Sequence, residues 1–120
     1  TEFFLYPELK SIALKTFGLI EPVREALQAY ADRIEEAFIF GSVVKGTDTE
    51  KSDVDVMIVG TVPQLELFEV AIQLRQKLGR VVQFNVYEPA EWSDLVENDP
   101  VIYQIVNGPK LQVMQHAKTD

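Results

Sequence analysis

The sequence predicts a single α+β domain, a two-layer fold in which a mixed β-sheet carries helices on one face. Two patterns indicate this class. Short stretches show the apolar pattern of strands, and segments with helical apolar spacing lie before and between them. The length of 120 residues and the apolar content of 47% suit one modest hydrophobic core. We therefore expect one functional site.

The N-terminal third is expected to be helical. Pro7 can open a first helix that Gly18 closes. A second helix should follow Glu21-Pro22, because apolar side chains recur there at helical spacing, at Val23, Ala26, Leu27, Tyr30, Ala31 and Ile34. We interpret residues 1–33 as a helical connector packed on a compact domain of residues 34–120.

The first residues suggest that the chain is a fragment of a longer protein. The sequence starts at Thr1 and runs at once into the apolar stretch Phe3-Phe4-Leu5-Tyr6. Such a stretch would be an exposed apolar patch unless it meets another surface. We expect it to contact either a missing neighbouring domain or a second copy of the chain in a homodimer.

Strands and helices alternate in the rest of the chain. Strands are predicted at residues 37–40, 53–59, 81–87 and 111–114, with a polar loop at 45–52. Two short helices, split at Asn98-Asp99-Pro100, are expected within residues 90–106, where Trp92 and Tyr103 should be core or cap residues. A longer helix should run from Pro63 to Gly79, with its apolar face formed by Leu67, Ala71, Leu74 and Leu78 and with Phe68 and Ile72 alongside.

The composition restricts the classes of function. A formal charge of -8 and a pI near 4.6 argue against non-specific nucleic-acid binding, and a phosphate substrate would need cations such as Mg²⁺ or Mn²⁺ held by carboxylates. The absence of cysteine excludes a disulfide framework and a thiolate nucleophile. Because no apolar run approaches about 18 residues, we expect a cytoplasmic protein without a membrane partner. The single histidine, His116, lies in a polar tail and is expected to have no catalytic role.

Small and acidic residues then combine into one candidate site. Gly41-Ser42 ends the first strand, and ten residues separate Ser42 from Asp53, with Asp55 two positions later. Carboxylates at i and i+2 of a strand project from one face about 6 to 7 Å apart, a spacing from which their oxygens can converge on a hard cation. Gly41 allows close approach of a phosphate, and Ser42 can donate a hydrogen bond to it. Lys45 is either a phosphate contact or a solvated loop charge.

This arrangement resembles the signature of the minimal nucleotidyltransferases, relatives of the polymerase-beta-like superfamily. The residues that carry the resemblance are Gly41-Ser42-Val43-Val44-Lys45-Gly46 and Ser52-Asp53-Val54-Asp55. From about residue 34 onward the chain is similar to such a domain, including the strand at 83–89 and the ending at 107–110. The first third is similar to the connector by which some bacterial members follow a winged-helix DNA-binding domain.

The resemblance implies roles for the residues of the motif. Gly41 and Ser42, with Lys45 and Ser52 beside them, would contact the phosphates of a nucleoside triphosphate such as ATP. Asp53 and Asp55 would bind Mg²⁺ as the catalytic carboxylates. The implied activity is transfer of a nucleoside monophosphate to a hydroxyl or phosphate acceptor of unknown identity.

The third carboxylate of the family pattern is expected on the strand at 81–87, where we place Asn85 at that position. An amide can lend a neutral oxygen to a metal, but it cannot accept a proton. Glu88 lies three residues further and should point to the other face. Two alternatives to an active transferase therefore stay open. One is a regulatory module that binds a nucleotide without transferring it, and the other is an antitoxin-like partner of a helical toxin.

Overall fold

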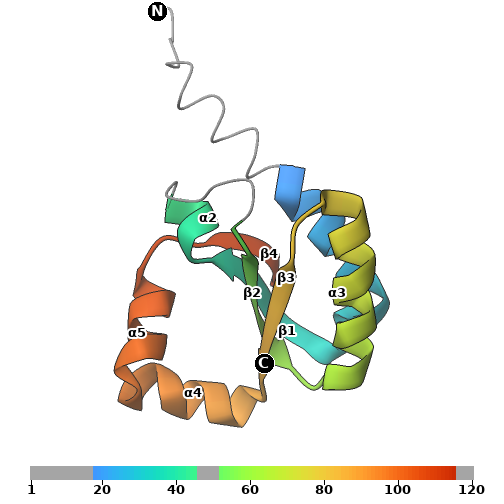
Figure 1. The fold of residues 1–120 in the computed structure, drawn as a ribbon. Helices are drawn as coiled ribbons and strands as arrows, with labels where there is room; N and C mark the ends of the chain where they lie inside the picture. The colour runs from blue at the N-terminus through green and yellow to red at the C-terminus, as the bar shows by residue number, and fades with distance from the viewer. Residues whose placement is uncertain (1–17, 46–51, 116–120) are drawn as a thin grey trace, which may run out of the picture.

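Four strands form one mixed sheet in a computed structural model that describes residues 18–45 and 52–115. The strands are β1 (Ile34–Phe40), β2 (Val54–Gly60), β3 (Val82–Tyr87) and β4 (Leu111–Gln115), and their spatial order is β3-β2-β1-β4. β1 runs antiparallel to both β2 and β4, whereas β2 and β3 are parallel and are joined through a helix (Figure 1). The predicted α+β class with a mixed sheet is confirmed.

One face of the sheet is covered by the helix of residues 18–27 and by α3 (Gln64–Leu78) (Figure 1). Between the first of these and β1 lies the 3-10 helix η1 (Gln28–Arg33). The strands turn their β-branched residues toward this face, as alternation along a strand requires. The main buried side chains of this layer are Val23, Leu27, Ala37, Ile39, Val54, Val56, Ile58, Leu67 and Leu74.

The second face of the sheet is also covered in part, which corrects the expectation of helices on one face alone. α4 (Pro89–Asn98) and α5 (Pro100–Asn107) lie on the opposite side of the sheet from α3 (Figure 1). Alternation along β1 and β2 gives this face apolar residues as well, so a second helical layer buries them. Its core is formed by Phe38, Met57, Val59, Trp92 and Ile102.

The two short helices are separated as predicted. The Asp99 carboxylate caps α5, because Oδ1 accepts hydrogen bonds from the backbone N–H groups of Val101 and Ile102, 2.9 and 3.2 Å away, and Pro100 occupies the first turn. Trp92 belongs to the core, whereas Tyr103 is 56% exposed and does not.

The N-terminal helices differ from the prediction. Most of the first predicted helix falls outside the described residues, but residue 18 is already helical, so Gly18 does not end a helix. The buried side chains of Leu19 and Val23 explain why the helix is stable on both sides of Pro22. Ile34 begins β1 opposite Gly60 instead of ending the second helix. The apolar residue is buried in either case, which is why its periodicity was ambiguous.

α3 buries a narrower face than its sequence suggested. Leu67, Val70 and Leu74 are buried, whereas Phe68 and Ile72 are 64% and 46% exposed. The helix ends at Gly79, which has a left-handed backbone with φ of 71°, as expected for a helix-ending glycine. No helix within residues 18–45 and 52–115 is long and apolar enough to cross a membrane.

Candidate nucleotide site

The corner after β1 is built on Gly41. Its φ is 85°, a left-handed conformation that glycine adopts at little cost. The Gly41 carbonyl accepts hydrogen bonds from the backbone N–H groups of Val44 and Lys45, both 3.1 Å away. These bonds close the four-residue helix α2 (Ser42–Lys45), where the sequence predicted a turn and then loop. Lys45 is therefore the last residue of a helical turn.

Asp55 lies against this corner although it is 14 positions further along the chain. The antiparallel register pairs Asp55 with Phe40, the residue before Gly41. A Cβ atom placed on Gly41 would stand only 2.7 Å from Asp55 Oδ2. Gly41 is thus required twice, for its backbone conformation and for the space that the Asp55 carboxylate occupies.

Burial and the neighbouring Asp53 both affect the ionisation of Asp55. Burial of the Asp55 side chain raises the pKa of its carboxyl group above the ordinary value of 3.8, and the neighbouring charge of Asp53 raises this pKa further. Both effects disfavour the ionised form of Asp55. A cation bound between the carboxylates would relieve them, because it neutralises the negative charge.

The start of β3 completes the surroundings of Asp53. The parallel register places Gln83 directly beside Asp55, and the Gln83 Nε2 group donates a hydrogen bond to Asp53 Oδ2. Two residues before Gln83, the carbonyl of Val81 accepts a hydrogen bond from the backbone N–H of Val54, 2.8 Å away. Gln83 was not predicted as a site residue, because strand alternation assigns a residue to a face but not to a neighbour on the next strand.

The positions of Asn85 and Glu88 follow from the same register. Asn85 shares the face of Gln83, but it lies beside Met57, two residues further along the strand and away from the acids. Glu88 follows Tyr87, which pairs with Val59 at the far end of β2. The five positions from Gln83 to Glu88 correspond to about 17 Å of strand, so Glu88 lies far from the two acids.

The Arg80 side chain connects the segment before β3 to the segment before β2. Its Nε and Nη2 groups donate to the backbone carbonyl of Ser52, at 3.1 and 2.8 Å. Ser52 immediately precedes Asp53, so this bidentate contact holds the chain just before the first acid. The predicted role of the Ser52 side chain at a phosphate stays a prediction.

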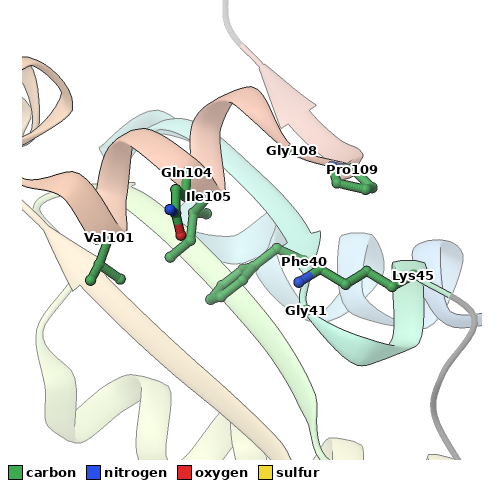
Figure 2. A pocket seen from close by; sticks show the side chains of 8 residues that line it. All are labelled: Phe40, Gly41, Lys45, Val101, Gln104, Ile105, Gly108 and Pro109. Atoms are coloured by element: carbon green, nitrogen blue, oxygen red, sulfur yellow. The ribbon is translucent and has the colours of Figure 1, made fainter.

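A pocket of about 120 Å³ opens beside Gly41 on the side of α5 (Figure 2). The Lys45 side chain reaches back across it toward Phe40 and Gly41 (Figure 2). The opposite wall comes from α5 and the segment after it, through Val101, Gln104, Ile105, Gly108 and Pro109. Lys110 comes directly after Pro109 in the chain, and its Nζ atom lies 4.8 Å from the centre of the Phe38 ring. The segment at 107–110 was part of the sequence resemblance, but the α5 residues of this wall were not predicted, because α5 is distant from the motif along the chain.

The donor set near the pocket fits a divalent cation in its chemistry. Asp53 and Asp55 supply carboxylate oxygens, which Mg²⁺ prefers. Within the described part of the chain, no group of three acidic, histidine or cysteine side chains gathers in a way that could hold a metal. The cation site is therefore based on two carboxylates, and the binding roles of Gly41, Ser42, Lys45, Asp53 and Asp55 stay predictions.

Comparison with known proteins assigns the family. The profile of the polymerase beta nucleotidyltransferase family matches residues 21–111, most of the chain and all of the candidate site. The chain therefore belongs to the polymerase beta nucleotidyltransferase family, as its sequence resemblance had implied.

Individual relatives agree with this assignment. A Methanocaldococcus jannaschii protein, provisionally named protein adenylyltransferase MJ0604, is 38% identical over 53 residues, which cover 44% of this chain. The chain spans about half (53%) of the length of that curated relative.

Solved structures share the fold at low identity. One chain of a toxin–antitoxin complex with AMP-PNP superposes with a TM-score of 0.61 and 20% identity, covering 82% of this chain and 74% of that one. A chain of a mutant of the toxin–antitoxin MntA-HpeT gives a TM-score of 0.60 at 18% identity, over 81% of this chain and 73% of that one. These likenesses establish the fold alone.

Proposed function

We propose that this domain binds a magnesium-bound nucleoside triphosphate and transfers its nucleoside monophosphate to an acceptor group. The observation that carries the proposal is the convergence of Gly41, Asp53 and Asp55 at one corner of the sheet, with a pocket beside it. Family membership supports the reaction class.

The chain's own residues would mainly position the substrate. The Gly41 corner would leave room for the phosphates, the Ser42 hydroxyl would donate a hydrogen bond to them, and the Lys45 ammonium group at the pocket would supply a positive charge. Asp53 and Asp55 would hold the cation. When bound, Mg²⁺ would neutralise charge on the attacking and leaving oxygens of an in-line displacement.

We propose ATP as the nucleotide and a protein side chain as the acceptor. Two observations support this choice. The relative from Methanocaldococcus jannaschii is named as a protein adenylyltransferase, and a structural neighbour was crystallised with the ATP analogue AMP-PNP. The toxin–antitoxin complexes among the structural neighbours are assemblies of two proteins, which is consistent with a protein partner as that acceptor.

The alternative is a regulatory module that binds the nucleotide but transfers it slowly or not at all. It is favoured by the donor set, since among the described residues only two carboxylates meet at the site. No third carboxylate among the described residues is then available to accept the proton of an acceptor hydroxyl.

Transfer and binding are separated by following ATP labelled at the α-phosphate together with release of pyrophosphate. We expect both label transfer and pyrophosphate release to need Mg²⁺, and to fall about 100-fold or more in Asp53→Asn and Asp55→Asn, because each change removes a charged oxygen ligand. Asp32→Asn, the same change at an exposed residue of η1, is the matched control. Unchanged transfer in both site variants would refute the proposed role of the acids.

A further inference from the structure

Gln83 is the side chain that connects β3 to the acidic pair. It stands beside Asp55 in the parallel register, and its amide donates to Asp53 Oδ2. It is exposed on the open part of the sheet's second face, whereas the apolar side chains further along that face are packed under α4 and α5. No other strand position brings a polar side chain of β3 so close to both acids.

We propose that Gln83 occupies the place at which a third carboxylate would complete a site for two cations, so that this chain holds a single divalent cation with its nucleotide. The inference rests on the proposed function, since it concerns the same site. It moves the determinant of activity from Asn85, favoured by the sequence pattern, to Gln83.

The charges of the side chains at the site favour one divalent cation over two. Two carboxylates balance one divalent cation, and the Gln83 amide adds no charge for a second. Its N–H group also occupies one oxygen of Asp53 as a hydrogen-bond donor. Within residues 18–45 and 52–115, no third acidic or histidine side chain joins the pair.

The register places Asn85 and Glu88 further from the acidic pair than Gln83. Asn85 lies beside Met57, two residues beyond the position next to Asp55. Glu88 follows the last pair of the register, which is formed by Tyr87 and Val59 near the far end of β2. A carboxylate at position 83 would lie next to both acids. One at position 85 would lie beside Met57, two residues further along the strand.

With an amide at position 83, transfer should be slow relative to nucleotide binding. The acids and one cation suffice to bind the phosphates, but an amide cannot accept the proton of an acceptor hydroxyl. Replacing Gln83 by an acid would supply both the charge for a second cation and a group able to accept that proton.

The test counts bound cations by electron paramagnetic resonance of Mn²⁺, on the full chain saturated with an ATP analogue that carries a methylene bridge between its α and β phosphates. We expect one bound Mn²⁺ for the unmodified chain and two for Gln83→Asp or Gln83→Glu. Asn85→Asp and Gln76→Glu, an exposed α3 position, add the same negative charge elsewhere and should leave the count at one. Because Gln83 is exposed, its acidic variants should fold.

The outcomes separate the inference from the proposed function. Two Mn²⁺ ions in the unmodified chain would overturn the inference, and so would a count of one in both acidic variants at position 83 while they still bind the analogue. A second ion gained in Asn85→Asp alone would return the determinant to Asn85. If the unmodified chain binds neither Mn²⁺ nor the analogue, the proposed function fails and the inference fails with it.

Discussion

At the scale of single residues, the site depends on a glycine that makes room for an acid. Gly41 combines a φ of 85° with a backbone so close to Asp55 that a Cβ atom would stand 2.7 Å from its Oδ2. The sequence predicted a close approach at Gly41, but to a phosphate. The approach to Asp55 depends on the pairing of β1 with β2, which no local pattern encodes.

Gly41→Ala should therefore weaken nucleotide binding in addition to lowering the stability of the fold. An alanine with positive φ is destabilised by about 1 to 2 kcal/mol, and its Cβ would also displace the Asp55 carboxylate. Gly79→Ala is the matched control, because Gly79 has a φ of 71° but nothing within 4 Å of an added Cβ. We expect similar losses of stability in thermal unfolding, but a loss of Mg-ATP affinity only in Gly41→Ala. Equal affinities in the two variants would contradict this account.

Asp55→Asn should stabilise the domain in the absence of metal. The pKa of Asp55 is raised in the folded state by burial and by Asp53, so the ionised carboxylate lowers stability at neutral pH. We expect a small gain in stability, measured as a higher melting temperature, at pH 7. The gain should vanish as the pH falls through the raised pKa, where Asp55 is already protonated.

Thermal melts in a chelating buffer between pH 7 and pH 3.5 measure this difference. The same variant should lose metal-dependent nucleotide binding, so stability and function change in opposite directions. A destabilised Asp55→Asn domain at pH 7 would show that the carboxylate is satisfied without a cation.

At the scale of elements, alternation predicted which face each strand residue takes, but not which residues meet across strands. Val54, Val56 and Ile58 lie on the face of α3, and Asp55 and Met57 lie on the other, as the sequence indicated. Gln83 and Asn85 both fit the face of the acids because the period of a strand is two. Only the register distinguishes them, and register depends on tertiary packing.

Helices show a similar division. Glycine, proline and Asp99 marked the ends of α3, α4 and α5 correctly, because these residues act through local backbone geometry. α2 could not be predicted, since four residues are too few for an apolar period. The buried face of α3 is narrower than predicted, because the sequence does not show how many of the apolar residues of a helix contact the sheet.

Adjacent residues of α3 provide a direct test of that face. Leu67 is 2% exposed and Phe68 is 64% exposed. Leu67→Ala should lower the free energy of unfolding by about 2 to 5 kcal/mol. Phe68→Ala should change it by less than about 0.5 kcal/mol, as surface substitutions usually do. Urea unfolding of both variants decides the matter, and a larger loss from Phe68→Ala would mean that α3 buries its other face.

At the scale of the whole molecule, cationic side chains stand near an acidic pair in a protein of net charge -8. Arg80 holds the chain before Asp53, Lys45 lines the pocket, and Lys110 lies at the edge of its far wall. The sheet brings these residues together because β1 ends where β2 and β3 begin. An overall negative field repels a free triphosphate, so a divalent cation should be required for its binding.

Calorimetric titration of the domain with ATP, with and without Mg²⁺, measures this requirement. We expect saturable binding with one site per chain in the presence of Mg²⁺, and its loss in the presence of a chelator, in Asp53→Asn and in Asp55→Asn. The Asp32→Asn control should bind like the unmodified domain. Binding of equal strength without a divalent cation, or undiminished binding in both site variants, would contradict a nucleotide site built on these two acids.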